Sequence, residues 1–372
     1  MNAYRVSGLI FANSHDSVMK RLTKERSMAS VPFGGRYRVI DFALSNFVNA
    51  GITNIAVITK ENYRSLMDHI GSGVYWDLDR KSGGIHIMPP FNIGGNRFYH
   101  GYIEALYGAL DFLERCNSEY MVLSEAGIIA NIDIAAAVDF HKNSKSDFTV
   151  IYKKSSAFEN KNGAMSMVVD DCGKVVSASV PQQVKDGENV SVGIYIANRD
   201  VLISAVRTAY ENGAQNFERD LLLSPGNEYK ISAFWHKEFC AVLDRPKSYN
   251  KASMDLLKRQ VRDQLFTRER PIFTKTRDDM PTRYGINAKV NNCFIADGCV
   301  IEGTVENSII FRGVTVGRGA KVSNCIIMQG GSVGENAEIT NVIADKNATI
   351  GSKMTAKGTE DKFFFIEKGQ KI

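Results

Sequence analysis

An apolar segment near the start of the chain, VSGLIF at residues 6–11, is followed by four polar side chains: Asn13, Ser14, His15 and Asp16. The segment has the pattern of a β-strand, and a Gly-Gly turn follows at 34–35. Proteins of the α/β class commonly hold phosphates at such a strand end, on a glycine-rich loop whose N–H groups approach the oxygens closely. Side chains at 13, 14 and 16 would crowd that approach, and the carboxylate at 16 would repel it. The sequence therefore predicts the frame of a phosphate site without a working phosphate loop.

The elements that would position these residues alternate along the first two-thirds of the chain. Strands are expected at 6–11, 54–59, 120–123, 148–153 and 190–198, and helices at 40–50, 61–70, 106–113 and 200–212. This alternation predicts a mostly parallel sheet with helices on both faces. A ligand would then lie beyond the carboxyl ends of the strands, where the four polar residues are expected.

The last third of the chain has a different pattern, with short β-branched runs separated by small turns. Val-Gly or Ile-Gly pairs recur every seventeen residues, at Gly317, Gly334 and Gly351. Apolar residues also recur six positions apart, as at Val316 and Val322. This degenerate hexapeptide repeat predicts a left-handed parallel β-helix, because a β-sandwich would place its turns less regularly. We expect a Rossmann-like domain at 1–245, a helical segment and linker at 246–284, and the β-helix at 285–372.

The composition narrows the class of protein. The chain has 372 residues, a net charge of +5 and no basic block, so no nucleic-acid partner is expected. Its densest basic run, Lys20, Arg21, Lys24 and Arg26, is expected to be a solvated helix face. The six cysteines form no C-x-x-C pair, which favours reduced thiols in the cytoplasm over zinc or disulfides. No signal peptide or run of 18 apolar residues is present, so no membrane association is expected.

A β-helix alone would suggest a hexapeptide-repeat acyltransferase, whose general base is usually a histidine on the helix wall. The six histidines are His15, His69, His86, His100, His141 and His236. None of them lies in the predicted β-helix, so this alternative lacks its base. A Rossmann-like domain followed by a β-helix is instead typical of sugar nucleotidyltransferases.

Several segments make this resemblance specific. The first, VPFGGRYRVIDFALSNFVNAGITNIAVIT, resembles the signature of the glucose-1-phosphate adenylyltransferase family of bacterial glycogen synthesis. Similar segments cover nearly the whole chain, at 31–59, 65–73, 98–106, 190–202 and 248–257. The resemblance implies a GT-A-like nucleotidyltransferase domain before the β-helix. Members of this family join ATP to glucose 1-phosphate, release pyrophosphate, hold Mg²⁺ on two aspartates and assemble as tetramers.

The phosphate loop departs from that family. Active members open with Leu-Ala-Gly-Gly-x-Gly-x-Arg-Leu, which aligns here with residues 11–19. Asn13, Ser14 and Asp16 stand at the three glycine positions, and Val18 stands at the triphosphate-binding arginine. Met28 replaces the lysine that precedes the Phe-Gly-Gly segment. The resemblance thus implies that these positions are degenerate.

The metal and sugar-phosphate motifs depart as well. Gly127 stands where the family has its first metal aspartate, and Val242 stands at the second. The Glu-Lys-Pro motif falls near Val180 and Pro181, without its Glu and Lys. Glu125 and Asp244 are neighbouring acids that could replace the metal ligands, although nothing in the sequence favours both doing so.

Some residues are kept. Arg36 and Arg38 follow the Gly-Gly turn, where active members place basic residues that contact anionic sugar-phosphate effectors; a structural ion pair with Asp41 explains them equally well. Arg312, in the β-helix, is either a surface residue or faces an effector. The family's sugar-binding stretch is matched at Ser191 and Gly193, which we expect to be retained as strand residues.

These observations predict a regulatory, non-catalytic subunit, because no neighbour can replace the lost arginine, lysines and metal carboxylates together. It resembles the diverged second subunit that Gram-positive bacteria commonly carry beside the catalytic one. The expected partner is that catalytic subunit, in a heterotetramer, with homo-oligomers of the chain alone as a further state. No cofactor is expected here, and Mg²⁺ is expected in the partner. The alternatives are an active nucleotidyltransferase with displaced ligands, or a small-molecule sensor or scaffold unconnected with glycogen.

Overall fold

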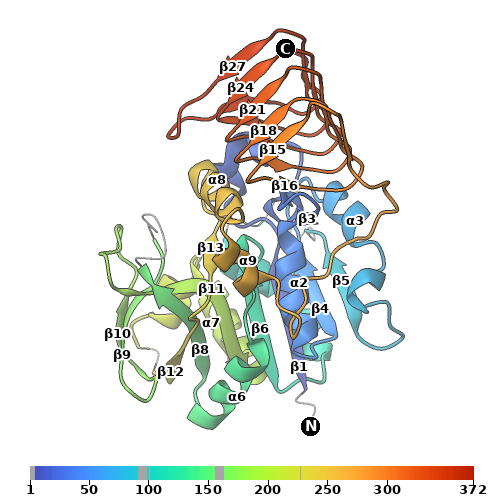
Figure 1. Cartoon of the computed structure of the whole chain (residues 1–372). Coiled ribbons are helices and arrows are strands. Elements are labelled where there is room, and N and C mark those ends of the chain that lie inside the picture. The colour runs from blue at the N-terminus through green and yellow to red at the C-terminus, as the bar shows by residue number, and fades with distance from the viewer. Residues whose placement is uncertain (1–4, 91–98, 100, 156–162, 227) are drawn as a thin grey trace.

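The computed structural model describes residues 5–90, 99, 101–155, 163–226 and 228–372, to which all structural statements below refer. An N-terminal α/β domain carries a coiled stack of short strands at its upper end (Figure 1). The strand ladder of that stack begins at Arg283, two residues before the expected boundary.

The N-terminal domain is built on a nine-stranded sheet with β10-β9-β11-β6-β1-β4-β5 along its main path, and β8 joins β11 to β12. Its strands are β1 (Val6–Phe11), β4 (Asn54–Ile58), β5 (Gly84–Met88), β6 (Tyr120–Glu125), β8 (Phe148–Lys154), β9 (Ser166–Val169), β10 (Val175–Ser179), β11 (Asn189–Asn198) and β12 (Ile231–Trp235). The half that contains β1, β4, β5 and β6 is parallel. The pairs of β11 with β6, β8 and β9 are antiparallel, so the sheet is mixed.

Helices cover both faces of this sheet (Figure 1). They are α2 (Val39–Asn49), α3 (Arg64–Ile70), α4 (Tyr102–Gly108), α5 (Leu110–Arg115), α6 (Ile134–Ser144) and α7 (Arg199–Glu211). Alternate residues of β1 point to opposite faces: Leu9 packs in the cluster that includes α4, α5 and α7, and Ile10 packs in the cluster that includes α2, α3 and α6. This alternation is the strand period of two, and both faces are dry because both are covered.

The β-helix consists of three parallel five-stranded sheets. The first contains β14 (Arg283–Tyr284), β17 (Val300–Ile301), β20 (Thr315–Val316), β23 (Ser332–Val333) and β26 (Thr349–Ile350). The second contains β15 (Lys289–Asn291), β18 (Thr304–Glu306), β21 (Lys321–Ser323), β24 (Glu338–Thr340) and β27 (Thr355–Lys357). The third contains β16 (Phe294–Ile295), β19 (Ile309–Ile310), β22 (Ile326–Ile327), β25 (Val342–Ala344) and β28 (Phe364–Ile366).

The coil repeat matches the expected period, because Val322 pairs with Ile339, seventeen residues further on. The two side chains are buried in one interior stack with Val305. Asparagines in the left-handed conformation occupy equivalent corners, as at Asn324 (φ 54) and Asn341 (φ 52). Asparagine tolerates this backbone region better than most residues, which explains its recurrence at the corners. The three sheets fit a left-handed parallel β-helix.

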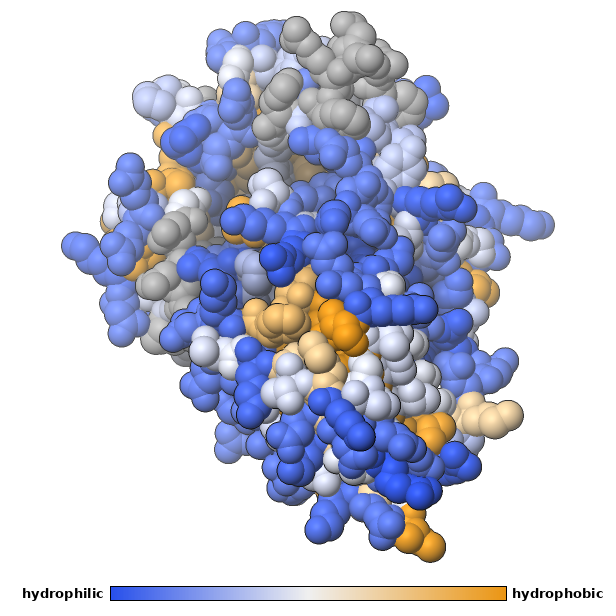
Figure 2. All heavy atoms as spheres, turned by 90° about the horizontal axis from the view of Figure 1, so that it is seen from above, coloured by the Kyte–Doolittle hydropathy of each residue, from blue (hydrophilic) through white to orange (hydrophobic). Residues whose placement is uncertain are grey.

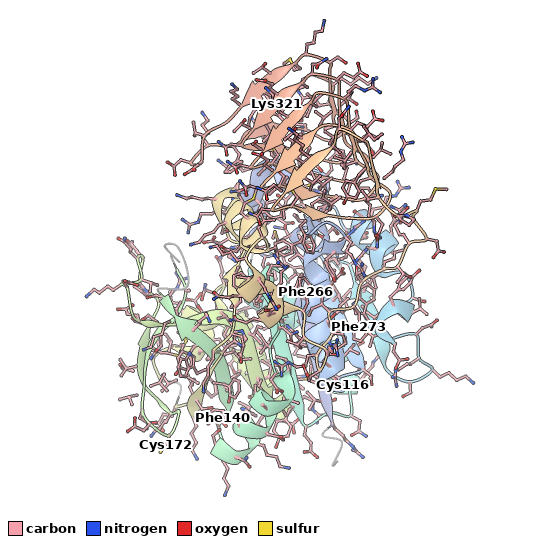
Figure 3. All side chains as sticks on the ribbon, in the orientation of Figure 1. Cys116, Phe140, Cys172, Phe266, Phe273 and Lys321 are labelled. Atoms are coloured by element: carbon pink, nitrogen blue, oxygen red, sulfur yellow. The ribbon has the colours of Figure 1, made fainter. Side chains whose placement is uncertain are left out.

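A shared apolar core joins the two parts. Two helices, α8 (Pro246–Asp255) and α9 (Arg259–Leu265), replace the single helical segment expected between them. Phe266 follows α9, stacks on Tyr37 at 5.3 Å and lies near the middle of the molecule (Figure 3). Phe33 and Phe42 from the N-terminal domain belong to the same core as Ile326 and Ile343 of the β-helix.

An ion pair also crosses this boundary. Arg26 donates two hydrogen bonds to the carboxylate of Asp345, both at 2.9 Å, and each side chain is only 4% exposed. The expectation that Arg26 belongs to a solvated helix face is therefore wrong. Its guanidinium is buried because a carboxylate on the β-helix neutralises it, a contact across 319 residues of sequence.

Seen from the β-helix end, the surface is mostly hydrophilic, with a small hydrophobic group near the centre of the view and isolated hydrophobic residues elsewhere (Figure 2). Within the described residues, no helix has the length and apolar composition needed to cross a membrane.

Deleting residues 285–372 should leave a fragment that aggregates or stays monomeric. The deletion would uncover Phe33 and Phe42, which pack in the shared core, and would remove Asp345, the carboxylate that pairs with Arg26. Light scattering and size-exclusion chromatography would measure this. A full-length Lys321→Ala chain is the control, because Lys321 lies on the outside of the β-helix and only pairs with Glu338 (Figure 3). A soluble fragment that still assembles would contradict the prediction.

Candidate functional site

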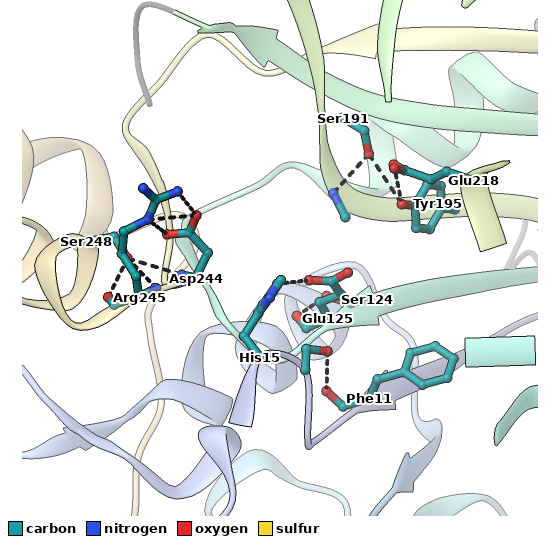
Figure 4. Close-up of polar contacts among 12 residues, drawn as sticks. Phe11, His15, Ser124, Glu125, Ser191, Tyr195, Glu218, Asp244, Arg245 and Ser248 are labelled. Carbon is teal, nitrogen blue, oxygen red and sulfur yellow. Dashed lines mark hydrogen bonds and ion pairs between the residues drawn. The ribbon is translucent and has the colours of Figure 1, made fainter. Parts of the chain in front are cut away.

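A cavity of about 550 Å³ lies at the carboxyl ends of β1 and β6, where the sequence placed the four polar residues. Asn13, Ser14 and His15 line one side of it, and Glu125 lies at the end of β6. Figure 4 shows the polar contacts around it. The cavity is large enough for a small-molecule ligand.

The loop after β1 is held by its own side chains. The amide of Asn13 donates to Asp16 Oδ2 at 2.6 Å and to the carbonyl of Glu61 at 3.1 Å, and its oxygen accepts the backbone N–H of Lys60 at 2.7 Å. Asp16 Oδ1 accepts the backbone N–H of Met28 at 2.8 Å. These hydrogen bonds fix the side chains of Asn13 and Asp16, and Asn13 takes up space in the cavity that a glycine would leave open.

Asp16 shows the electrostatic consequence. Burial raises the pKa of its carboxyl to about 6, against the hydrogen bonds from Asn13 and Met28, which lower it. Above that pH the carboxylate adds negative charge where a triphosphate would need positive charge. The loop therefore disfavours anions by charge as well as by occupancy.

The two positions that replace basic family residues face away from the cavity. Val18, on α1 (Asp16–Met19), is 47% exposed, and Met28 is fully buried in the shared core. Val180 follows β10 and packs against the core of the sheet, and the carbonyl of Pro181 accepts the N–H of Gly163 at 3.2 Å. None of these four residues lines the cavity within the described part of the chain.

The two metal-equivalent positions lie close together. Val242 of β13 (Cys240–Val242) pairs with Ile128 of β7 (Ile128–Ala130), and the next residue, Leu243, donates to the carbonyl of Gly127 at 2.7 Å. The fold thus brings 127 and 242 together although neither carries a carboxylate.

The nearby acids are already paired. Glu125 contacts His15 Nε2 at 3.1 Å, and Asp244 forms an ion pair with Arg245 at 2.7 Å (Figure 4). Among the described residues, no group of three or more His, Cys, Asp or Glu side chains is placed to hold a metal ion. These residues therefore fit a Mg²⁺ clamp poorly, because hard divalent cations need several oxygen ligands. The absence of a cofactor stays a prediction.

Ser191 and Gly193 shape the opposite wall. Ser191 Oγ accepts the N–H of Gly193 at 3.1 Å, where the pairing of β11 with β8 shifts register. Gly193 has φ +87, and a Cβ there would lie 3.0 Å from the carboxyl carbon of Glu125. Glycine is required at 193 for both reasons. The two residues form a bulge that seats Glu125 and presents Tyr195.

A carboxylate that sequence reasoning missed completes this wall. Glu218 lies on a π-helical turn (Phe217–Leu222), accepts the hydroxyl of Tyr195 at 2.6 Å and accepts the N–H of Met165 at 2.8 Å (Figure 4). Isolated π-helical turns often mark functional positions. No motif pointed to Glu218, because its partners are distant in the sequence.

Both parts of the chain match known protein families. Residues 12–226 match the nucleotidyl transferase family model, and residues 279–364 match the model of the GlmU-like C-terminal hexapeptide. The chain is 34% identical to the glycogen biosynthesis protein GlgD of Bacillus subtilis (strain 168), over 97% of this chain and 95% of that one. It is 33% identical to the glucose-1-phosphate adenylyltransferase of Clostridium botulinum (strain Alaska E43 / Type E3), over 86% and 83% of the two chains.

The chain belongs to the glucose-1-phosphate adenylyltransferase family. A second GlgD, from Geobacillus stearothermophilus, is 36% identical over 98% of this chain and 96% of its own. The resemblance inferred from the motifs is confirmed, as is the fold of a nucleotidyltransferase domain followed by a hexapeptide domain. The site residues stay predictions.

The arginines singled out from the sequence, Arg36, Arg38 and Arg312, lie where the N-terminal domain meets the β-helix. Arg36 is exposed and lies 5.6 Å over the ring of Tyr37. Arg312 is 8% exposed, and its Nε makes no hydrogen bond within the described part of the chain and lies 3.7 Å from Asp279. Burial and then the charge of Arg36 lower the pKa of Arg312, so these two cations lie within electrostatic reach of each other.

The side chain of Arg38 does not form the ion pair with Asp41 that the sequence offered as one of two explanations. Its guanidinium donates to the carbonyl and the hydroxyl of Ser65 at 2.6 and 2.8 Å. Asp41 accepts only the backbone N–H of Arg38, at 2.9 Å, and its other oxygen contacts His69. Burial, helped by the charge of Arg26, lowers the pKa of Arg38 to about 10.

Lys346 of the β-helix lies within electrostatic reach of Arg38 and Arg26. Burial, together with the charges of Arg38 and Arg26, lowers the pKa of its amine to about 7. A lysine with such a pKa gains its proton readily when an anion binds nearby. We call Arg36, Arg38, Arg312 and Lys346 the boundary cluster.

Proposed function

We propose that this chain is a cytoplasmic, non-catalytic subunit that modulates a catalytic glucose-1-phosphate adenylyltransferase in bacterial glycogen biosynthesis. The observation that carries the proposal is the locked loop: Asn13 and Asp16 occupy the N–H groups of Lys60 and Met28. The fold around this loop is intact. A chain that keeps the fold but not the phosphate site fits a protein that acts through its contacts with another subunit.

The extent of the alignments also supports this role. The alignments with the two GlgD proteins span 97% and 98% of the chain, and the alignment with the Clostridium botulinum adenylyltransferase spans 86%.

The proposed partner is the catalytic subunit, in a heterotetramer, and Mg²⁺ would be bound by that partner. The first coil of the β-helix offers a surface for it: Met280, Tyr284 and Ile286 are 81%, 54% and 101% exposed. They adjoin β14, the edge strand of its sheet, whose unpaired backbone groups a partner could cover.

Assays of the catalytic subunit with and without this chain test the proposal. An unchanged kinetic response of the mixed complex would reject it.

We further propose that the boundary cluster binds a phosphorylated sugar effector. The charges of Arg36 and Arg277 act on Arg312 beside those of Asp279 and Asp297, and its buried Nε has no hydrogen-bond partner among the described residues, a costly arrangement that an anion would relieve.

Sulfate should raise the thermal stability of the chain at millimolar concentration, and Arg312→Gln should weaken sulfate binding on the order of tenfold. Binding should also weaken as the pH rises from 6 to 8, because Lys346, with a pKa of about 7, loses its proton in that range. Sulfate keeps its charge across this range, so the change reports on the protein. Unfolding temperatures measured against equal ionic strength of chloride would follow both effects. Arg318→Gln, an exposed arginine of the same β-helix, is the control, and an equal loss in both variants would contradict the prediction.

A further inference from the structure

The cavity has a second side that the locked loop does not fill. Four side chains on different elements face it: Tyr102 of α4, Glu125 of β6, Tyr195 of β11 and Glu218 of the π-helical turn. We call them the tyrosine–glutamate wall. These side chains could bind a ligand even though the phosphate loop beside them is degenerate.

The hydroxyl of Tyr102 is the first indication of a ligand. Its oxygen is buried and makes no hydrogen bond of good geometry within the described residues, although the Ser14 side chain lies beside it. Burial raises the pKa of Tyr102 well above its ordinary value, so the hydroxyl keeps its proton. Buried hydroxyls normally have a partner, and a ligand in the cavity would supply one.

The carboxylates around the cavity indicate which ligand charge it would favour. Glu218 accepts two hydrogen bonds, from the hydroxyl of Tyr195 and the N–H of Met165, out of the roughly four that a carboxylate can accept. Glu125 and Asp244 also line the cavity, as do the cations Lys60 and Arg219, and Asp16 lies behind the loop. The carboxylates of Glu218 and Glu125 disfavour a phosphate beside them but accept hydrogen bonds from hydroxyl groups.

The aromatic rings add an apolar contact. The rings of Phe11 and Tyr102 lie 3.7 Å apart between centroids, and both residues line the cavity. The C–H face of a hexose packs against such rings, while its hydroxyls both donate and accept hydrogen bonds. The amide groups of Gln215 and Asn216 also line the cavity and match such hydroxyls.

We propose that the tyrosine–glutamate wall binds an uncharged polyhydroxylated ligand, an unphosphorylated hexose or a short chain of hexoses. This ligand class differs from the anionic substrates of the family, because the phosphate-binding part of the cavity is locked and acidic. The proposal does not depend on assembly with a catalytic subunit, so it stands or falls separately from the proposed function.

Isothermal titration calorimetry of the full-length chain tests the proposal, with glucose, maltose, glucose 1-phosphate, ADP and adenosine as probes. Glucose or maltose should bind saturably, and the two phosphorylated probes at least about tenfold more weakly. Tyr102→Phe should weaken hexose binding roughly tenfold without lowering the unfolding temperature, because the lost hydroxyl makes no hydrogen bond of good geometry with the described residues. Glu218→Gln should reduce the ratio of the glucose affinity to the glucose 1-phosphate affinity, because it removes a negative charge that repels the phosphate.

Tyr284→Phe, at an exposed tyrosine of the β-helix, is the matched control and should bind hexose like the unaltered chain. The proposal is overturned if neither glucose nor maltose binds saturably, if adenosine or a phosphorylated probe binds more tightly than both, or if Tyr102→Phe binds hexose unchanged.

Discussion

Purified alone and supplied with ATP, glucose 1-phosphate and Mg²⁺, the chain should form ADP-glucose at least about 10³-fold more slowly than a catalytic family member. Metal clamping of the reacting phosphates is worth several kcal/mol of transition-state stabilisation, and the positions that would provide it hold Gly127 and Val242. Glu125 and Asp244 are engaged by His15 and Arg245. A coupled pyrophosphate-release assay would measure the rate.

The control for this assay is a catalytic relative under the same conditions. The double substitution Gly127→Asp and Val242→Asp sharpens the test: it places carboxylates at two neighbouring positions but leaves Asn13 and Asp16 bound to the N–H groups of Lys60 and Met28. We expect this variant to stay inactive. Turnover of the unaltered chain within tenfold of the relative would show that displaced residues do the chemistry.

In complex with the proposed catalytic subunit, the chain should change that subunit's apparent substrate affinity or effector response by roughly 5- to 150-fold. This range corresponds to the coupling of about 1–3 kcal/mol that is typical between allosteric sites. The effect should pass through the subunit interface, because the chain itself lacks a working phosphate site. Steady-state kinetics of the co-purified complex and of the catalytic subunit alone would measure it.

Changes inside the loop separate this explanation from a second active site. Glycine at Asn13, Ser14 and Asp16 with arginine at Val18 should leave the stimulation largely unchanged, since the metal ligands would still be absent. A complex that behaves like the catalytic subunit alone, or stimulation abolished by these four substitutions, would make the regulatory interpretation wrong.

The periodic parts of the fold could be predicted from the sequence. The strand at Val6–Phe11 has its expected bounds, and the seventeen-residue repeat appears directly in the register of Val322 with Ile339. Both follow from local patterns that burial reinforces. The predicted helix at 106–113 is instead interrupted between α4 and α5, where a Cβ on Gly108 would lie 2.7 Å from the hydroxyl oxygen of Tyr99.

Contacts between distant segments could not be predicted. Arg26 was expected in solvent because its local sequence is basic, and nothing near it indicates Asp345 as a partner. Glu218 reaches the cavity only because a π-helical turn brings it to Tyr195. The residue types at 13, 14, 16 and 18 predict which groups the phosphate site lacks. The hydrogen bonds that hold Asn13 and Asp16 in the same loop can be found only from the structure.

The lock formed by Asn13, Asp16 and Met28 also bears on the history of the chain. Glycine at 16 would free the N–H of Met28 but leave the Asn13 amide without one of its partners, and glycine at 13 would leave the Asp16 carboxylate buried with fewer hydrogen bonds. Each single step back toward a phosphate loop therefore loses stability before any catalysis returns. Selection can retain only intermediates that fold well, so the loss of the phosphate site is difficult to reverse in evolution. A lineage that has acquired this lock is expected to retain two distinct subunits.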